Sequence, residues 1–350
     1  MARRSTIRGI ALRLLLLAAL IGGGACWWAS TPYKGFTTDA IVQLDRGTST
    51  RTMAEKLEEA GVVSSKYAFL LARATRPSAK LQAGEYLFHD KASPWAVLDR
   101  VVRGDVHYYE FTAPEGSNLF DIAKLVDGVG GIRSDDFLRA AKNPALIRDL
   151  DPNAPTLEGY LFPSTYRVTA KTTAEQLTKQ MTDQFRKHWK QIGGTASAHT
   201  IVTLASLVEK ETGTNAERPL VASVFQNRLD KGHKMECDPT TIYAAILQGR
   251  WTGVIQRSDL DSKHPYNTYQ HTGLPPGPIA NPGVASLNAA LHPAQTDFLF
   301  FVAKAGGGGH TFSSGLAAHN RAVQAYRSGM AVAKSTPGVN NGSAGTRKKQ

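Results

Sequence analysis

Glu209 and Glu211 end a strongly apolar segment, in the sequence Leu204-Ala-Ser-Leu-Val-Glu-Lys-Glu-Thr212. Each residue of an α-helix turns by about 100°, so Glu211, which follows Leu207 by four positions and Val208 by three, projects from the apolar side. A carboxyl group in partly apolar surroundings has a raised pKa and stays protonated near neutral pH. Such a group can serve as a general acid, so Glu211 is the candidate catalytic residue.

Glu209 lies on the opposite border of the same stripe, four residues after Ala205, and its apolar neighbours are smaller. We therefore expect Glu209 to support Glu211 rather than replace it. Acids at a helix C-terminus are unfavourable with the helix dipole, so stability does not explain this pair. The alternative interpretation is a helix end with two ordinary surface acids.

A loop further along the chain, residues 266–283, contains three glycines and four prolines among polar and aromatic residues. Proline fixes the backbone, and glycine permits close approach or a positive φ. The Asn, Thr and Tyr side chains offer the donors, acceptors and aromatic faces that sugars require. A carboxyl group beside a rigid polar groove is suited to cleaving a glycosidic bond, and a purely structural Ω-like loop is the alternative.

Periodicity, capping signals and breakers predict the elements that must position these candidates. The breaker cluster Asp-Pro-Asn-Ala-Pro at 151–155 indicates a domain boundary. We expect helices over residues 173–192, 199–212, 217–231 and 319–333, and an apolar strand over 298–303 followed by a glycine turn.

The N-terminal half repeats one pattern. In residues 40–69 and again in 108–137, a strand-like alternation leads through a glycine turn to a helix with Ser or Thr placed as its cap. A further strand is expected at 81–88, between the two stretches. This order is that of a small sugar-binding βααβ module, although an α+β domain can repeat such a pattern by chance.

The net charge of +12 is concentrated at the two ends of the chain. Arg3, Arg4, Arg8, Arg13 and the basic residues at 347–349 account for seven positive charges, which leaves +5 for the remainder. This balance is compatible with an anionic polymer but is no footprint of nucleic-acid binding, so no nucleic-acid partner is expected. The chain has two cysteines, one of them in the N-terminal apolar run, so no internal disulfide is expected.

Residues 10–30 are predicted to form a membrane anchor. The run 14–28 has no charge and ends in two tryptophans, which favour a membrane interface. It is shorter than the ~20 residues of a usual span, so we expect Arg13 to snorkel to the cytoplasmic side. The basic residues 1–9 place the N-terminus inside and the rest of the chain outside the cytoplasm; a cleaved signal peptide is the alternative.

Other chemistries have little support. His310 and His319 lack a metal-ligand spacing, so neither a metal nor another cofactor is expected. The sequence has no GxSxG motif and no cysteine in a nucleophile context, and residues 306–309 lack the Lys and Ser/Thr of a phosphate loop. Asp238 is either the N-cap of a helix starting near Thr240 or a second site carboxylate, and we favour the cap.

Six short motifs resemble, in the same order, those of the YceG-like family of endolytic murein transglycosylases. They are ASLVEKET at 205–212, ASVFQNRL at 222–229, DPTTIY at 238–243, YNTY at 266–269, TGLPPG at 272–277 and GHTF at 309–312. The layout of an anchor, a LysM-like module and a catalytic domain also resembles this family.

The resemblance implies a bitopic inner-membrane enzyme that cuts nascent peptidoglycan glycan strands internally and so ends their elongation. The family's catalytic Glu, directly before Thr, falls on Glu211. Its protonated carboxyl would donate to the oxygen between N-acetylmuramic acid and N-acetylglucosamine. Its carboxylate would then deprotonate the muramic 6-hydroxyl, which closes on C1 to leave a 1,6-anhydro end, so the usual second carboxylate is not required.

The predicted site combines catalytic Glu211 with substrate-binding and supporting residues. The substrate-binding candidates are Tyr266, Asn267, Thr268, Tyr269, Gly273, Leu274, Pro275, Pro276, Asn281 and His310, and the supporting candidates are Glu209, Glu217 and Asp238.

The expected fold class is α+β, with an N-terminal transmembrane helix, a small LysM-like βααβ module and a mixed α/β catalytic domain. The predicted parts are a cytoplasmic basic tail (1–9), the anchor (10–30), a LysM-like glycan-binding region (37–150), a periplasmic catalytic domain (151–334) and a disordered tail (335–350). Expected partners are peptidoglycan glycan strands, the inner membrane and cell-wall synthases.

Two rival functions stay open. The first is a hydrolytic muramidase in which Glu209 or Asp238 activates water. The second is a non-catalytic glycan-binding scaffold of the cell-wall synthesis machinery.

Overall fold

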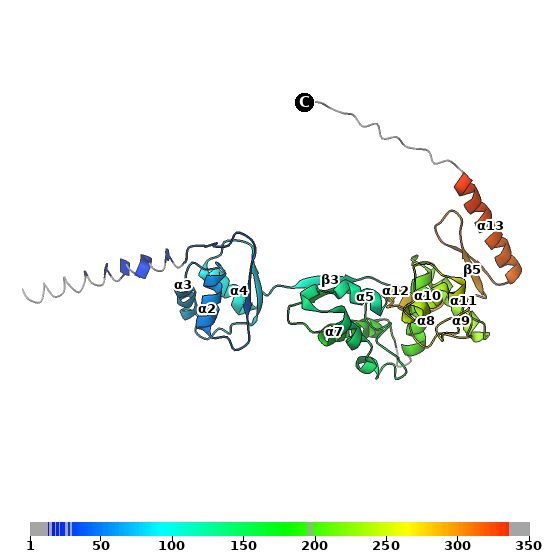
Figure 1. Ribbon diagram of the computed structural model, residues 1–350, viewed down its shortest axis with the longest axis horizontal. Coiled ribbons are helices and arrows are strands. Elements are labelled where there is room, and N and C mark those ends of the chain that lie inside the picture. Colours follow the sequence, from blue (N-terminus) through cyan, green and yellow to red (C-terminus); the bar gives the residue numbers. More distant parts are fainter. Residues whose placement is uncertain are drawn as a thin grey trace, which may run out of the picture. The chain divides into compact units, whose positions relative to one another are not determined.

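The computed structural model describes residues 30–194 and 198–335, together with scattered positions between 13 and 28. These residues form two compact units (Figure 1). The first unit holds the described residues up to Glu110 and Arg167–Thr172, and the second holds Phe111–Tyr166 and the described residues from Thr173 onward. Helices and two-stranded sheets occur in the same chain, so the fold class is α+β, as predicted.

The first unit begins with the strand and helix order expected from the sequence. Its elements are β1 (Ala40–Leu44), α2 (Thr50–Glu59), α3 (Lys66–Ala74), β2 (Gly84–Phe88) and α4 (Pro94–Arg103). β1 and β2 pair antiparallel, with Ala40 opposite Phe88 and Leu44 opposite Gly84. This pairing brings the two ends of the βααβ segment side by side.

Local signals explain why these elements form. A serine precedes each helix, and the hydroxyl groups of Ser49, Ser65 and Ser93 accept hydrogen bonds from backbone N–H groups of the first turn. This is the cap that a helix N-terminus requires. The buried side chains of Leu57 and Phe69, on α2 and α3, then form one core with the inward-facing residues of both strands and of α4.

The second unit opens with a similar order. Its first elements are β3 (Tyr109–Ala113), which belongs to it from Phe111 onward, α5 (Leu119–Val126), the short 3₁₀ helix η1 (Val129–Gly131), α6 (Ser134–Ala141), the 3₁₀ helix η2 (Pro144–Ile147) and β4 (Ser164–Val168), which belongs to it up to Tyr166. β3 and β4 form a two-stranded sheet. The repeated strand-helix-helix pattern of the sequence is therefore present in the fold.

The site is carried by the helices that follow. They are α7 (Ala174–Gln191), α8 (Ala198–Glu211), α9 (Arg218–Asp230), α10 (Asp238–Leu247), α11 (Arg257–Leu260) and α12 (Val284–Leu291). α8 packs against α9, α10 and α12. Every residue from Val202 to Val208 is buried, so α8 is enclosed on nearly all sides rather than along the single apolar stripe that the periodicity predicted.

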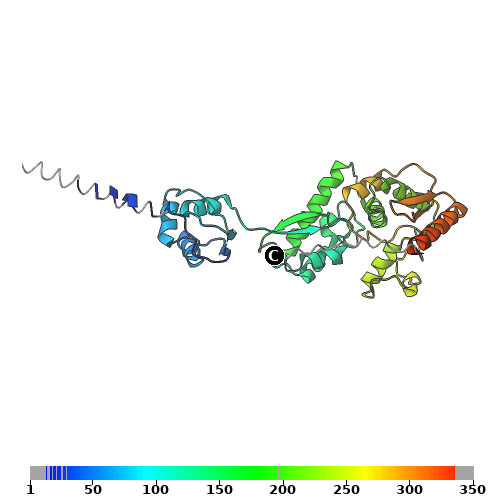
Figure 2. The same cartoon turned by 90° about the horizontal axis from the view of Figure 1, so that it is seen from above.

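The chain ends in a hairpin and a long helix. β5 (Phe300–Ala303) and β6 (His310–Ser313) pair antiparallel across the predicted glycine turn. α13 (Leu316–Ser335) packs against both strands, as the two views in Figures 1 and 2 show. The disordered tail was predicted from residue 335, and all of it except Ser335 lies outside the described residues.

The predicted anchor, residues 10–30, lies largely outside the described residues and stays a prediction. Within the described part of the chain, none of the helices combines the length and apolar character that a bilayer span needs.

Residues 111–150 belong to the second unit, where α5 packs on α6 and α6 packs on α7. The predicted division at residue 150 separates glycan binding from catalysis. The packing does not test that assignment, which stays a prediction.

Candidate active site

Glu211 is the last residue of α8 and lies at the wall of a cavity of 380 Å³ in the second unit. Residues from α9, α10, the loop before α10, the predicted polar loop, β5 and α13 surround the carboxyl group. The lining residues are Glu211, Phe225, Arg228, Met235, Glu236, Asp238, Tyr269, Phe300, Phe301 and His319. Aromatic side chains therefore form much of the wall around one carboxyl group.

The surroundings of Glu211 favour its protonated form. Its one hydrogen bond among the described side chains comes from the Cys237 thiol, whose Sγ lies 3.1 Å from Glu211 Oε1, and no cation in the described part of the chain forms an ion pair with it. Burial raises the pKa of Glu211, and the negative Asp238 adds to the rise, whereas the Cys237 hydrogen bond and His310 oppose it. The net direction is upward, as the apolar helix predicted.

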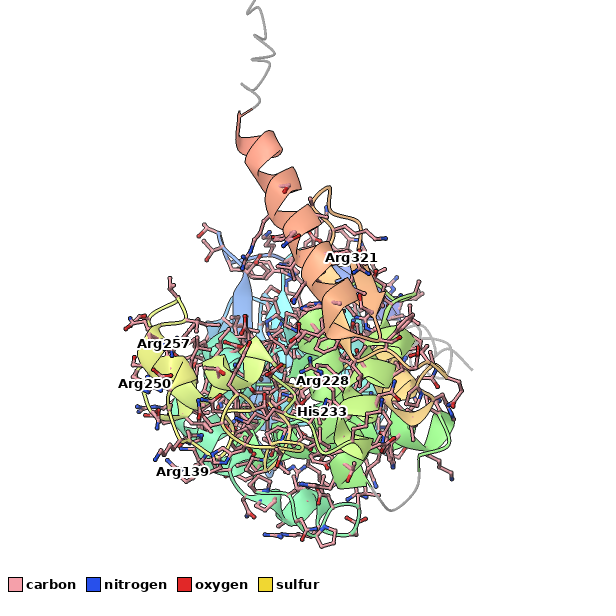
Figure 3. The ribbon with its side chains drawn as sticks, turned by 90° about the vertical axis from the view of Figure 1, so that its right-hand side faces the viewer. Arg139, Arg228, His233, Arg250, Arg257 and Arg321 are labelled. Atoms are coloured by element: carbon pink, nitrogen blue, oxygen red, sulfur yellow. The ribbon has the colours of Figure 1, made fainter. Side chains whose placement is uncertain are left out.

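The other two carboxylates at the cavity already have partners. The Tyr269 hydroxyl donates to Asp238 Oδ1 at 2.7 Å, and Arg228 Nη1 lies 3.1 Å from Glu236 Oε2. Arg228 comes from α9, among the helices of the second unit (Figure 3). The cavity thus holds two hydrogen-bonded carboxylates and one, Glu211, whose described partner is a thiol.

The preference for Asp238 as a helix cap was wrong. α10 begins at Asp238 itself, and Cys237 is its N-cap residue, without a capping hydrogen bond from its side chain. Pro239 follows in the first turn, where the N–H that proline lacks would have no partner within the helix. The Asp238 carboxylate is therefore free of a capping role and lies at the cavity instead.

Glu209, two residues before Glu211, has a different environment. Its Oε1 lies 3.3 Å from Arg218 Nη2, and both side chains are almost fully buried. Its Oε2 accepts a hydrogen bond of 3.0 Å from the backbone N–H of Gly283. Glu209 therefore attaches the end of the 266–283 loop to α8 and α9, which is a structural role distinct from that of Glu211.

Glu217 and His310 form a pair at the start of α9. The Glu217 carboxylate accepts from the His310 backbone N–H at 2.7 Å and lies 2.7 Å from His310 Nδ1. Burial raises the pKa of Glu217, but the His310 hydrogen bonds outweigh it and hold the pKa below its usual value. The His310 ring packs edge-on against Phe301, which lines the cavity, so this pair supports the wall behind Glu211.

The predicted sugar-binding residues of the 266–283 loop divide into two groups. Tyr269 lies at the cavity. Tyr266, Asn267, Thr268 and Asn281 are buried, and the polar side chains of the last three bond to protein groups. For these four, direct contact with a substrate stays a prediction, and their observed contacts hold the loop in place.

The remaining loop candidates also lie away from the cavity lining. Gly273 has a positive φ of 81°, which the sequence analysis anticipated for a glycine of this loop. Leu274 is half-buried, Pro275 is buried and Pro276 is exposed. Their roles in substrate binding stay predictions.

Gly159 holds the same loop against the helices. Its φ is 88°, and a Cβ there would lie 2.5 Å from Cγ of Pro278 and 2.8 Å from Cγ1 of Val202. We expect Gly159→Ala to lower the free energy of unfolding by roughly 3 kcal/mol, from left-handed strain and overpacking. Gly128→Ala is the matched control, because Gly128 has a φ of 80° with open space around it. Chemical denaturation should give a clearly larger loss for Gly159→Ala, and equal losses would contradict a tight contact.

Glu158 is a buried acid outside the cavity. Its Oε2 accepts from the Leu119 N–H at 3.0 Å and the Tyr243 hydroxyl at 2.9 Å, and its Oε1 accepts from Asn281 Nδ2 at 2.9 Å. Burial raises the pKa of Glu158 to about 8, against the opposing effect of these hydrogen bonds. Glu158 is thus protonated in the folded protein at neutral pH.

This raised pKa makes stability depend on pH. Above pH 4.5, the ordinary pKa of a glutamate, the unfolded state loses the Glu158 proton while the folded state keeps it. The resulting stability is complete at low pH and is lost as pH rises through about 8, with a slope of about 1.4 kcal/mol per pH unit. Denaturation curves between these limits should show a shallower decline for Glu158→Gln than for wild type. The exposed Glu175→Gln is the control, and equal slopes in all three proteins would refute the prediction.

Several cavity residues were not found from the sequence. Phe300 and Phe301 were expected in an apolar strand. Phe225 and Arg228 belong to the motif at 222–229 that carries part of the family resemblance, but no role in the site was inferred for them, and Met235 and Glu236 follow that helix outside any motif. His319 was considered only for metal binding. Its ring stacks on Phe300 at 5.0 Å, its Nδ1 is buried without a hydrogen-bond partner among the described residues, and burial, then Arg228, lowers its pKa.

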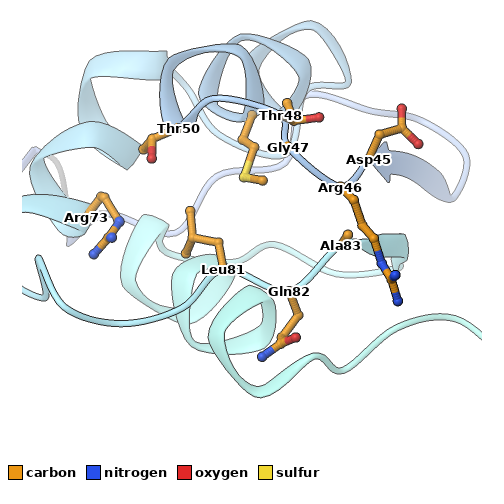
Figure 4. A pocket seen from close by; sticks show the side chains of 10 residues that line it. Asp45, Arg46, Gly47, Thr48, Thr50, Arg73, Leu81, Gln82 and Ala83 are labelled. Atoms are coloured by element: carbon orange, nitrogen blue, oxygen red, sulfur yellow. The ribbon is translucent and has the colours of Figure 1, made fainter.

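A second cavity, of 430 Å³, lies in the first unit (Figure 4). Its walls are the loop between β1 and α2, the end of α3, and the segment that enters β2. The lining residues are Asp45, Arg46, Gly47, Thr48, Thr50, Met53, Arg73, Leu81, Gln82 and Ala83. Hydroxyl, amide, carboxylate and guanidinium groups line this cavity beside a few apolar carbons.

Comparisons with known proteins agree over most of the chain. The model of the YceG-like family matches residues 42–325. The endolytic murein transglycosylase of Bacillus subtilis (strain 168) is 32% identical over a gapped alignment of 316 positions, which covers 84% of this chain and 86% of that protein. The endolytic murein transglycosylase of Streptococcus pneumoniae serotype 2 is 26% identical over a gapped alignment of 366 positions, which covers 91% of this chain and 65% of that longer protein.

A solved structure gives the same result for the fold. A putative YceG-like protein from Listeria monocytogenes superposes with a TM-score of 0.53 and 29% identity, covering 82% of this chain and 99% of that one. With the family match extending from β1 to the middle of α13, the chain belongs to the YceG-like family.

Proposed function

We propose that this protein is an endolytic murein transglycosylase and that Glu211 is its acid and base. The observation that carries the proposal is the position of Glu211 at an aromatic-walled cavity, with a raised pKa and a thiol as its described hydrogen-bond partner. The curated relatives named endolytic murein transglycosylase support the reaction class. The enzyme is thus a lyase that acts on the glycan strands of peptidoglycan.

The reaction proceeds through one carboxyl group. Protonated Glu211 donates its proton to the oxygen between N-acetylmuramic acid and N-acetylglucosamine, and the bond from muramic C1 to this oxygen breaks. The Glu211 carboxylate then accepts the proton of the muramic 6-hydroxyl, whose oxygen bonds to C1. The new end is a 1,6-anhydro ring, no water is consumed, and Glu211 returns to its protonated form.

The geometry favours this scheme over the two-carboxylate scheme of most glycosidases. Asp238 and Glu236 are the other carboxylates at the cavity, and each is hydrogen-bonded to a neighbouring side chain. Glu209 is paired with Arg218 and is not part of the cavity lining. The muramidase alternative would need one of these three groups to activate water.

We also propose that the first unit is a LysM-like module that binds glycan in its 430 Å³ cavity. The βααβ order and the mixed polarity of the lining support this assignment. Thr48 and Gln82 are suited to bond sugar hydroxyl and acetamide groups. Calorimetric titration with soluble peptidoglycan glycan strands should show weaker binding to Gln82→Ala than to wild type, and equal affinities would argue against this cavity.

The substrate places the catalytic unit outside the cytoplasm. We propose the periplasmic side of the inner membrane, with residues 10–30 as the anchor and cell-wall synthases as neighbours. Cell fractionation should recover the full chain with the inner membrane. Protease should digest the residues after 30 once it reaches the outer face of that membrane, without entering the cytoplasm.

The experiment that tests the function is mass spectrometry of the glycan ends released from uncrosslinked peptidoglycan. The full chain in detergent is expected to release strands with 1,6-anhydro ends, and Glu211→Gln should release none. Reducing ends, heavier by one water, would make the protein a hydrolase. Intact strands with both proteins would leave the scaffold alternative.

A further inference from the structure

The thiol of Cys237 is placed against the candidate catalytic carboxyl group. Cys237 is 1% exposed, and its Sγ donates a hydrogen bond of 3.1 Å to Glu211 Oε1. Burial, followed by the neighbouring Glu211, raises the pKa of the Cys237 thiol well above its usual value. The sulfur therefore keeps its proton and acts as a donor.

The backbone around Cys237 is fixed by the 266–283 loop. The Cys237 N–H donates to Thr268 Oγ1 at 3.1 Å, and the Thr240 hydroxyl donates to the Cys237 carbonyl at 2.6 Å. The Thr268 and Thr240 hydroxyls lie 2.8 Å apart, which closes a buried network around the thiol. Thr268, one of the buried loop residues predicted to bind sugar, thus helps to hold the donor of Glu211 in place.

The residue before Cys237 adds a second sign of constraint. Glu236 is the non-glycine residue with positive φ in the described part of the chain, at 52°. Such a conformation costs of order 1–3 kcal/mol and persists only where the surroundings enforce it. The Glu236 N–H also donates to the Thr268 carbonyl, at 3.3 Å. Strained backbone and loop bonds together aim the thiol at Glu211.

The other charged and titratable groups around Glu211 do not donate a hydrogen bond to it among the described side chains. Asp238 on α10 raises the pKa of Glu211 and His310 on β6 lowers it. Arg228 on α9 is engaged by Glu236 and by backbone carbonyls, and Tyr269 by Asp238. His319 of α13 lines the cavity with its ring stacked on Phe300. Cys237 alone of the described side chains donates a hydrogen bond to Glu211.

Resting on the proposed function, we propose that Cys237 is a positioning residue that orients the Glu211 carboxyl toward the cleaved bond through a weak thiol hydrogen bond. A hydrogen bond to a carboxylate favours the charged form, so a strong donor here would deprotonate the acid. A thiol is a weak donor. It can therefore fix the orientation of the carboxyl group while leaving it protonated.

The test compares Cys237→Ser and Cys237→Ala in the full chain. A hydroxyl is the stronger donor, so Cys237→Ser should move the high-pH limb of the cleavage profile to lower pH, by roughly 0.5 to 1 unit. Cys237→Ala removes the donor, so the limb should move to higher pH, with cleavage about tenfold slower at its optimum because the carboxyl group is no longer oriented. Cys26→Ser, at the other cysteine, is the control and should leave the profile unchanged.

A second measurement does not depend on activity. The infrared S–H stretching band of Cys237, isolated by subtracting the spectrum of Cys237→Ala, should shift when Glu211→Ala removes its acceptor. If the Cys237→Ala variant does not fold, the spectrum of wild type minus Glu211→Ala in a Cys26→Ser background reports the same band.

The outcomes separate the two proposals. If wild type releases no anhydro ends, the proposed function fails whatever the S–H band shows. If wild type is active but both Cys237 variants keep its pH profile, or the S–H band does not respond to Glu211→Ala, the thiol does not position Glu211. The inference is supported if the high-pH limb moves to lower pH in Cys237→Ser and to higher pH in Cys237→Ala, and if the S–H band of Cys237 shifts.

Discussion

Glu211→Gln is expected to slow glycan cleavage by roughly 10³-fold or more, since one residue supplies both proton transfers and general acid–base catalysis contributes about 10²–10⁴-fold. The substitution keeps the size of the side chain, and Gln can still accept the Cys237 hydrogen bond. Because burial raises the pKa of this carboxyl group and so favours its neutral form, a neutral amide should leave the fold intact. Chemical denaturation of the variant should therefore match wild type.

The matched controls are the other carboxylates of the cavity. Asp238→Asn and Glu236→Gln each weaken one hydrogen bond, to Tyr269 or Arg228, and are expected to slow cleavage by about tenfold or less. Chromatography of the released anhydro ends measures the cleavage rate of each variant against wild type. A Glu211→Gln variant that keeps more than about a tenth of the wild-type rate would remove Glu211 from the chemistry.

Glu209→Ala is expected to have the largest effect on stability. It leaves the almost fully buried Arg218 without its ion-pair partner and removes the acceptor of the Gly283 N–H. Breaking a buried pair by removing one partner costs about 3–5 kcal/mol, so the free energy of unfolding should fall by about that amount. The measurement is chemical denaturation at neutral pH.

The control is Asp183→Ala, which breaks the exposed Lys179–Asp183 pair of α7 at 2.6 Å. Exposed pairs contribute about 0–1 kcal/mol, so the two variants should differ severalfold in their loss. Glu209→Gln keeps hydrogen-bonding capacity and is expected to weaken cleavage without abolishing it. A loss of activity as large as that of Glu211→Gln, in a folded protein, would show that Glu209 takes part in the reaction.

The sequence carried enough information to place Glu211 at the end of an apolar helix because its evidence is local. Helical periodicity places it beside Leu207 and Val208, and the structure ends α8 at this residue. The same local signals gave the βααβ order, since serine caps and strand alternation act within a few residues. Elements of this kind can be predicted from neighbouring residues alone.

The cavity itself depends on packing between distant segments. Phe300 and His319 reach Glu211 from β5 and α13, and no spacing in the sequence indicates that meeting. The polar loop also depends on packing that its sequence does not reveal. Its Asn267 and Thr268 have side chains suited to sugars, but in the fold their hydrogen bonds are made to protein groups, because a compact loop must satisfy its own buried polar atoms.

Asp238 shows how a small shift in an element boundary changes an interpretation. A helix start near Thr240 would have made Asp238 a cap. Instead α10 starts at Asp238, whose carboxylate accepts a hydrogen bond from the Tyr269 hydroxyl. Helix ends commonly shift by one or two residues. Here that shift exchanges a structural role for a place at the cavity.

The central claim is that one protonated carboxyl, Glu211, carries the cleavage, and the pH profile of the cleavage rate tests it most directly. Since burial raises the pKa of Glu211, activity should be high at low pH and fall along a single limb as pH rises through that raised value. Asp238→Asn removes a negative neighbour, so it should move this limb to lower pH without adding another. A bell-shaped profile whose low-pH limb disappears in Asp238→Asn would assign the second step to Asp238 and contradict the single-carboxyl account.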